Sequence, residues 1–177
     1  MDNNEVFLNA SEHLFNLSFA ETLMLRNYSK INNLRFCTMA GGSESIRDIQ
    51  EAKNLQADGL EFNMVESLFA LDKIFNSIIK IFSNRNAIEN LKIFINVASP
   101  DGIKLITNIK DLILPANFKR SNIIFNFDRR SLIKTFYDIK NDNFQSIEYE
   151  KHINPCVYES IEILKANGFE SSLSGGI

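Results

Sequence analysis

The feature that most constrains the fold of this chain is a regular alternation between short apolar runs and longer segments with helical spacing. A short apolar run bounded by turn residues predicts a buried strand, whereas apolar residues that recur every three or four positions predict one face of a helix. We expect strands at Leu14–Phe19, Leu34–Met39, Gly59–Val65, Leu91–Val97, Asn122–Phe127 and Phe169–Ser174.

The segments between these strands have the apolar periodicity of helices that cover a sheet. Their apolar faces are formed by Leu68, Leu71, Phe75, Ile78 and Phe82, by Ile106, Ile109 and Ile113, by Leu132, Phe136 and Ile139, and by Val157, Ile161 and Leu164.

Turn residues mark the boundaries of several of these helices. Ser43 with Glu44 predicts a helix start, and Pro100–Asp101–Gly102 predicts a turn from a strand into the next helix. Asn154–Pro155 predicts the start of the last helix, and Asn167–Gly168 predicts its end.

Strand followed by helix, at about 25–35 residues per unit, predicts one α/β domain over residues 1–177 with a parallel sheet. The architecture we expect is an incomplete TIM-type barrel of about six strand-helix units, because a closed barrel of eight needs about 250 residues. An open doubly wound parallel sheet is the structural alternative. Either the sequence is part of a longer barrel or the protein is a shortened relative, and a shortened barrel should pair with another copy or another chain, as in a homo-oligomer.

Composition excludes several classes of partner. The net charge of -3 argues against nucleic acid and against an anionic membrane surface as binding partners. No run approaches the roughly 18 apolar residues of a membrane span, since the longest candidate, Leu68 to Phe82, is interrupted by charged residues. Cys37 and Cys156 have neither metal-site nor disulfide-framework spacing, so we expect a cytoplasmic protein and interpret Cys37 as a core residue.

Polar side chains follow the expected strands where ligands bind in parallel α/β folds. They are Ser18, Thr38, Asn63, Asn96, Asn126, Ser172 and Ser174, followed by Glu21, Glu66, Ser99, Asp101 and Asp128. Each alone could cap a helix or satisfy a loop amide, but together they predict one polar rim. Glu61 has the same parity as Asn63, and Asn126 the same parity as Asp128, so each pair should point to one side of the sheet. Carboxylates that converge there suit a divalent cation such as Mg²⁺.

Two further features suggest anion binding. Gly41 and Gly42 form a strand-to-helix turn whose amides could hold an anion, although a plain tight turn is the simpler interpretation. Gly175–Gly176 could likewise hold an anion or form a plain tight turn. Arg129 and Arg130 could hold a carboxylate or phosphate, or could form a solvated pair.

The sequence also resembles a known family over roughly Ser18 to Ile177. Ala40–Asp48, Glu51–Lys53, Ala57–Leu60 and Met64–Leu71 are similar to segments of the HpcH/HpaI aldolase and citrate lyase superfamily, in particular to the branch known only as aldolase/citrate lyase family proteins. The resemblance implies a TIM barrel, a divalent metal, Mg²⁺ or Mn²⁺, and a reaction at a carbon–carbon bond next to a 2-oxo acid or acyl group.

The resemblance assigns Asp128 to the family's metal-binding Asp position. The family's metal-binding Glu corresponds to Val97–Ala98–Ser99, which has no carboxylate, and a small shift of the match brings Asp101 there instead. Arg129 and Arg130 stand where the family has Leu and Ser, and no segment matches the strand of its substrate-binding Arg.

Three functional hypotheses follow. The first is a metal-dependent carbon–carbon lyase or aldolase-like enzyme that acts on a 2-oxo acid or acyl substrate through an enolate. Its metal ligands would be Asp128 with Asp101 or Glu66, and its substrate-binding residues Asn63, Asn96, Asn126, Gly41 and Gly42. The second is a degenerate, non-catalytic barrel that binds a small acid or a partner protein. The third is a phosphate-binding barrel of another family, with phosphate at Gly175–Gly176.

Overall fold

The structure is a computed structural model that describes residues 7–9, 17–140 and 147–174. Its strands are β1 (Phe7–Asn9), β2 (Arg35–Ala40), β3 (Gly59–Phe62), β4 (Lys92–Val97), β5 (Ile123–Asp128) and β6 (Glu170–Ser174). Its α-helices are α1 (Phe19–Ile31), α2 (Ile46–Asn54), α3 (Leu68–Phe82), α4 (Arg85–Asn90), α5 (Pro100–Thr107), α6 (Arg129–Phe136) and α7 (Ile147–Ala166).

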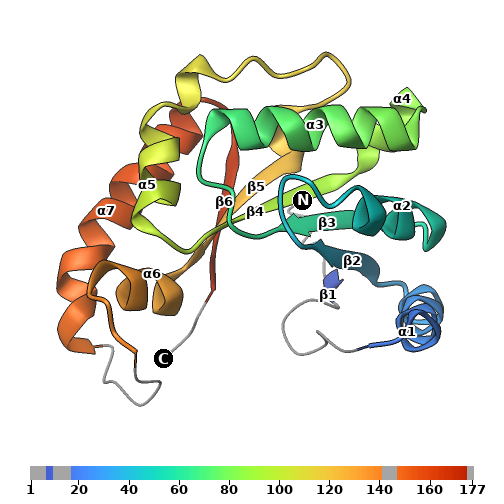
Figure 1. The fold of residues 1–177 in the computed structure, drawn as a ribbon, viewed down its shortest axis with the longest axis horizontal. Helices are drawn as coiled ribbons and strands as arrows, with labels where there is room; N and C mark the ends of the chain where they lie inside the picture. Colours follow the sequence, from blue (N-terminus) through green and yellow to red (C-terminus); the bar gives the residue numbers. More distant parts are fainter. Residues whose placement is uncertain (1–6, 10–16, 141–146, 175–177) are drawn as a thin grey trace.

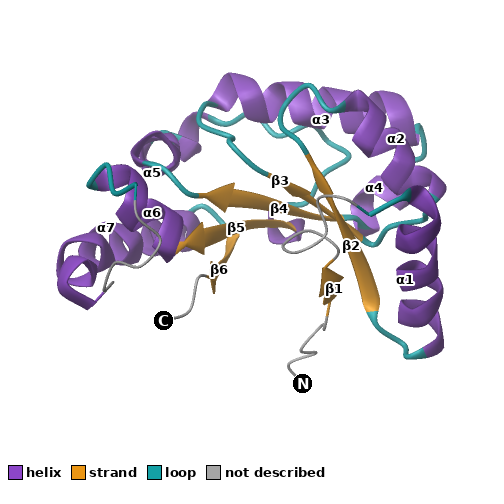
Figure 2. Ribbon diagram, turned by 60° about the horizontal axis from the view of Figure 1, so that its bottom comes forward, coloured by secondary structure: helices purple, strands orange, loops and turns teal. Residues whose placement is uncertain are grey.

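The six strands are all parallel and lie in the sheet in their order along the chain, from β1 to β6 (Figure 1). A doubly wound sheet requires a point at which the strand order reverses, and this order has none. Figure 2 shows the helices along one side of the curled sheet. The chain is therefore an incomplete TIM-type barrel, as the sequence predicted, and the doubly wound alternative is wrong.

Alternation along the strands separates the two faces of the sheet. In β4, Ile93, Ile95 and Val97 are fully buried against the helices, whereas Phe94 and Asn96 point to the concave side. Strand β5 repeats this pattern with buried Ile123, Phe125 and Phe127. The hydrophobic core therefore lies between the sheet and its helices, and the concave face is free to carry polar side chains.

The predicted strand at Leu14–Phe19 is wrong within the described residues. Residues 14–16 lie outside them, but Ser18 caps α1 and Phe19 begins that helix. Ser18 and Glu21 form a reciprocal capping box, in which each side chain bonds to the backbone of the other residue. The first strand instead lies at Phe7–Asn9. A Ser followed three residues later by Glu was the signal that the apolar run obscured.

Three helix boundaries also differ from prediction. Pro155 lies inside α7, which begins at Ile147, so Asn154–Pro155 is not a helix start. Helix α5 ends at Thr107, and Ile113 is 87% exposed beyond a short 3₁₀ turn. Helix α6 ends at Phe136, before Asp138, whose φ of +49° does not continue a right-handed helix. The expected helix end at Asn167–Gly168 is confirmed, with Gly168 at φ +77°.

Across the described ranges, none of the helices combines the length and the apolar character that a membrane span requires.

Candidate functional site

The carboxyl ends of β3 to β6 bring polar side chains onto the concave face of the sheet. Asn96 of β4 lies in register with Asn126 of β5, and Asn126 lies in register with Ser172 of β6. Residues in register on neighbouring strands point to the same side, so these side chains meet. The predicted polar rim therefore exists over these strands.

A continuous chain of side-chain hydrogen bonds crosses these strands. Asn126 donates to Asn96 Oδ1 over 2.8 Å, and Asn96 donates in turn to Glu61 and to Asn63. At the other end, Ser172 donates to Asn126 Oδ1 over 3.0 Å, and Asn126 Nδ2 donates to Ser174 over 3.1 Å. We call this set the amide ladder; its members are Glu61, Asn63, Asn96, Asn126, Ser172 and Ser174. The structure thus joins the three asparagines that the sequence proposed as substrate ligands.

Glu61, like Ser172 and Ser174, was not among the site residues proposed from the sequence. It points from β3 to the concave face and is only 4% exposed. Its register partners are Met39 of β2 and Phe94 of β4, so its surroundings are partly apolar. Burying a carboxylate is costly unless it is hydrogen-bonded, and the amide of Asn96 provides such a bond. The parity that Glu61 shares with Asn63 was the signal for its place in the site.

Cys37 lies beneath the amide ladder on β2. A side chain added at Gly59 would come within 3.2 Å of its sulfur, so β2 and β3 are tightly packed there. Burial raises the pKa of the Cys37 thiol well above its usual range, and the negative charges of Glu61 and Asp58 raise it further. Cys37 is therefore a protonated core thiol, as expected, and not a nucleophile.

The three carboxylates predicted as metal ligands lie at or just beyond the ends of strands of this rim: Asp128 is the last residue of β5, and Glu66 and Asp101 follow β3 and β4. Asp128 caps α6, where its oxygens accept from the backbone N–H of Ser131 over 3.1 Å and from the Ser131 hydroxyl over 2.6 Å. Glu66 accepts a hydrogen bond from Ser99, which follows β4 and caps α5. Asp101 is exposed in the first turn of α5.

Within residues 7–9, 17–140 and 147–174, no group of three or more His, Cys, Asp or Glu side chains is arranged to hold a metal ion. The donors are nevertheless of the hard oxygen type that Mg²⁺ prefers. Mg²⁺ is usually bound by one or two carboxylates together with water and substrate oxygens, so a third protein carboxylate is not required.

The Gly41–Gly42 turn lies beside the site without joining the amide ladder. A side chain added at Gly42 would lie 4.0 Å from the carbonyl oxygen of Asn63. The N–H of Gly41 donates to Asp48 over 2.9 Å, and that of Gly42 donates to Ser45 over 3.1 Å. A ligand held by these amides would have to replace those bonds. Gly175–Gly176 lies outside the described residues.

Two buried polar atoms in the described chain have no hydrogen-bond partner, namely Arg129 Nε and Thr38 Oγ1. Arg129 immediately follows Asp128 and opens α6. Buried donors are usually paired, so an unsatisfied guanidinium nitrogen next to a rim carboxylate is unusual.

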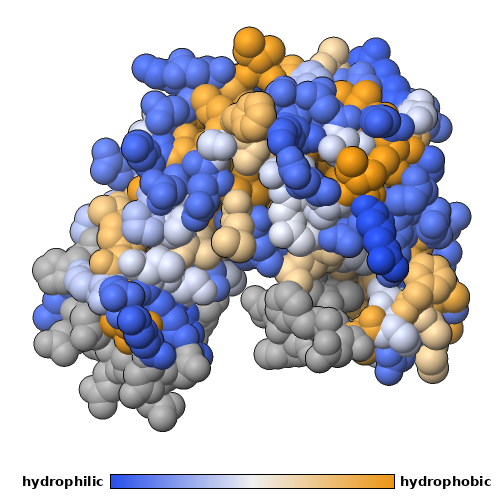
Figure 3. Space-filling view, in the orientation of Figure 1, coloured by the Kyte–Doolittle hydropathy of each residue, from blue (hydrophilic) through white to orange (hydrophobic). Residues whose placement is uncertain are grey.

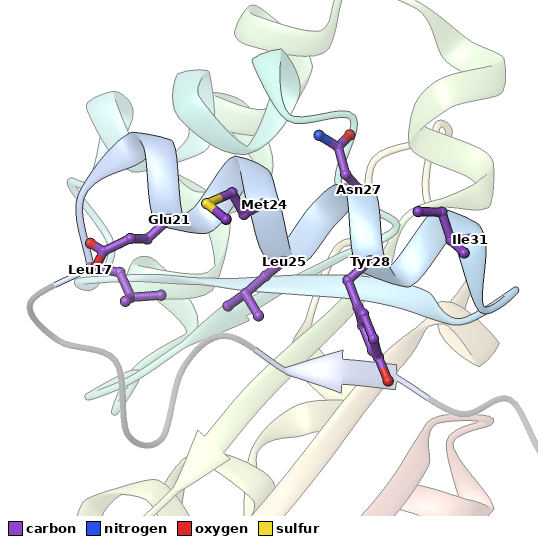
Figure 4. Close-up of a pocket in the computed structure, with 7 residues that line it drawn as sticks. All are labelled: Leu17, Glu21, Met24, Leu25, Asn27, Tyr28 and Ile31. Atoms are coloured by element: carbon purple, nitrogen blue, oxygen red, sulfur yellow. The ribbon is translucent and has the colours of Figure 1, made fainter.

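A second surface feature lies far from this chemistry. An apolar groove on α1 is lined by Leu17, Glu21, Met24, Leu25, Asn27, Tyr28 and Ile31 (Figure 4). Figure 3 shows hydrophobic surface over α1 at the lower right of the molecule. The groove exposes few polar groups, so it is better suited to packing against another apolar surface than to catalysis.

Comparisons with solved structures relate the fold to known proteins. Citrate synthase SbnG matches with a TM-score of 0.69 at 13% identity, over 95% of this chain and 66% of that one. A HpcH/HpaI aldolase/citrate lyase family protein from Burkholderia cenocepacia J2315 matches with a TM-score of 0.67 at 10% identity, over 94% of this chain and 69% of that one. A HpcH/HpaI aldolase from Desulfitobacterium hafniense DCB-2 matches with a TM-score of 0.66 at 12% identity, over 94% and 66%.

No protein-family model matches the sequence, and no curated protein sequence matches it. The chain spans about two thirds of the length of citrate synthase SbnG. At these identities the likeness is one of fold. The chain thus has the barrel fold of the HpcH/HpaI aldolase and citrate lyase structures, in incomplete form.

Proposed function

We propose that this chain is an aldolase- or lyase-like enzyme that forms or breaks a carbon–carbon bond next to a 2-oxo acid or acyl group, through an enolate of its substrate. The observation that carries the proposal is the amide ladder at the carboxyl ends of the strands. In TIM barrels the active site lies at this end. The fold likeness to HpcH/HpaI structures supports the reaction class.

The composition of the concave face also supports a functional site. Barrel interiors are usually filled by branched apolar side chains. Here three neighbouring strands carry Glu61, Asn96 and Asn126 instead. Replacing buried polar groups by apolar ones of similar volume is often neutral or stabilising, so fold stability alone does not account for this choice.

We propose Mg²⁺, or Mn²⁺, as the cofactor, with Asp128 as one ligand and Glu66 or Asp101 as its companion. When bound, such an ion would act as a Lewis acid on the substrate's oxygens. Glu66 accepts a hydrogen bond from Ser99, which follows β4, and β4 pairs with the strand that ends at Asp128. This link supports Glu66 as the companion carboxylate. Each oxygen of Asp128 accepts one hydrogen bond from Ser131 and has a second lone pair for a cation.

In this proposal the asparagines of the amide ladder and Arg129 bind different groups of the substrate. Each carboxamide oxygen of Asn63, Asn96 and Asn126 accepts one hydrogen bond within the ladder and has a second lone pair for a substrate hydroxyl or water. Arg129, with its unsatisfied Nε, is the group we propose for the carboxylate of a 2-oxo acid.

Calorimetric titration of MgCl₂ in the presence of pyruvate tests this assignment. We expect binding that is lost in Asp128→Asn and retained in Asp111→Asn, a control at an exposed aspartate of the 3₁₀ turn after α5. Equal Mg²⁺ affinity in Asp128→Asn and in the unchanged chain would contradict the metal site.

A second function is a barrel that binds a small acid without turnover. The observation in its favour is that Ser131 already bonds both oxygens of Asp128. This function predicts that pyruvate binds equally well with and without Mg²⁺. The phosphate-binding hypothesis and the expected pairing with another copy remain predictions, which phosphate titration and sedimentation velocity would test.

A further inference from the structure

One path of hydrogen bonds through the amide ladder runs in a single direction, from β6 to β3. Starting at β6, Ser172 donates to Asn126, Asn126 donates to Asn96, and Asn96 donates to Glu61 on β3. Each carboxamide could in principle turn over and exchange its donor and acceptor, so this shared direction needs a cause.

The carboxylate of Glu61 provides that cause because its oxygen accepts a hydrogen bond from Asn96. Asn96 must therefore present its NH₂ group to Glu61, which leaves its oxygen toward Asn126. That oxygen requires the NH₂ group of Asn126, whose own oxygen then faces Ser172 and accepts from it. One carboxylate on β3 thus sets the orientation of groups as far away as β6.

We infer that Glu61 is a positioning residue that fixes the polarity of the amide ladder, so that its β6 end presents hydrogen-bond acceptors to the ligand. This inference rests on the proposed function only in taking the ladder as a ligand site. It assigns the chemical class of the group bound there: a hydroxyl or an ammonium group, which can donate.

The hydrogen bonds of the two serines at the β6 end explain this choice of ligand class. The proton of Ser172 is used by Asn126, so the lone pairs of its oxygen remain for a ligand. Ser174 accepts from Asn126 and directs its own proton toward the carbonyl oxygen of Phe127 over 3.5 Å. A carboxylate at this end would face acceptors and would be disfavoured. The acidic end of a substrate should therefore lie elsewhere on the rim.

The side-chain amide signals of asparagine report this polarity directly. In the full chain labelled with ¹⁵N-asparagine, we expect Glu61→Gln to shift the NH₂ signals of both Asn96 and Asn126, because a neutral amide no longer dictates the orientation. Glu170→Gln is the matched control, since Glu170 lies on β6 but outside the ladder; it should leave the Asn96 signal unchanged. A Glu61→Gln variant that shifts Asn96 but leaves Asn126 unchanged would overturn the inference.

A second measurement uses the unchanged chain, so it does not depend on whether a variant folds. Ethanolamine, which carries hydroxyl and ammonium donors, should perturb the backbone signals of Ser172 and Ser174 more strongly than acetate at equal concentration. Stronger perturbation by acetate, or none by either probe, would overturn the assignment of ligand class. Because neither experiment involves Mg²⁺ or turnover, a failure of the proposed lyase activity would not affect them.

Discussion

Nη1 of Arg26 lies 2.9 Å from Oδ2 of Asp58, joining α1 to the start of β3 at the end of the sheet opposite the amide ladder. The same guanidinium donates to the carbonyl oxygens of Leu55 and Gln56 over 3.2 Å and 2.6 Å. The Asp58 oxygen also accepts from the backbone N–H of Phe36 on β2. Arg26, which is 7% exposed, therefore fastens a helix and two strands together.

This connection predicts a large loss of stability when Arg26 is replaced. Arg26→Met removes the guanidinium donor from two backbone carbonyls and from the Asp58 carboxylate, which we expect to cost about 3 kcal/mol in the free energy of unfolding. Urea denaturation followed by circular dichroism measures the loss. Lys73→Met is the control, because Lys73 pairs with exposed Glu44 and should hardly move the urea midpoint. Equal midpoints for the two variants would contradict the role given to Arg26.

The raised pKa of Cys37 predicts an unreactive thiol. Below the raised pKa the folded chain keeps the neutral thiol, so at pH 8 a thiol reagent should modify Cys156 but not Cys37. In denaturant both cysteines should react. The same shift predicts that stability falls as pH rises above about 9, where only the unfolded chain ionises at this residue. Rapid modification of Cys37 in the folded chain would show that the concave face is more open than described.

The amide ladder predicts a non-additive pair of substitutions. Asn96→Leu removes a donor to Glu61 and the partner of Asn126, and should cost about 3 kcal/mol. The double variant Glu61→Leu with Asn96→Leu should be more stable than Asn96→Leu alone, since no carboxylate is then left without that donor. Asn76→Leu, on the exposed face of α3, is the control and should change stability little. Strict additivity would mean that Glu61 and Asn96 are not coupled.

Met64 predicts a gain of stability when it is changed to glycine. It follows Asn63 at the end of β3, has a φ of +56° and is 80% exposed. A left-handed conformation costs a residue with a side chain about 1–2 kcal/mol, part of which glycine loses again through its flexibility when unfolded. We expect Met64→Gly to stabilise the fold by about 0.5–1 kcal/mol in urea denaturation. Asn33→Gly should gain less, because asparagine tolerates this conformation better. A destabilised Met64→Gly would indicate that the Met64 side chain supports the rim.

The comparison of sequence and structure shows which signals are local. Strands β2 to β6 were predictable because short runs between turn residues stand out from their surroundings, as in Ile93–Val97, where Ile93, Ile95 and Val97 are fully buried. Helix α1 was not, because much of its apolar surface is exposed, as at Met24 and Ile31, so its periodicity is weak. Pro155 was misleading because a proline normally ends or begins a helix, and its tolerance inside α7 depends on tertiary packing.

The polar rim at the strand ends was predictable from the sequence, whereas the hydrogen bonds that connect its members were not. Their positions near the ends of successive strands predicted that Asn96 and Asn126 lie on one rim, and this prediction is confirmed. The direction of the hydrogen bonds depends on Glu61, whose burial follows from register between strands that are distant in sequence. Asp128 and Ser99 both cap helices, so a polar residue at the end of a strand can be interpreted from sequence either as a helix cap or as a ligand-binding group.

The central claim is that the rim around Asp128 and the amide ladder promotes loss of a proton next to the carbonyl of a 2-oxo acid. Exchange of the methyl protons of pyruvate in D₂O, followed by proton NMR with the full chain and MgCl₂, tests it most directly. The account predicts exchange well above the rate without protein, and a loss of most of that increase in Asp128→Asn but not in Asp111→Asn. Exchange at the rate without protein, in a chain that is folded and binds pyruvate, would contradict it.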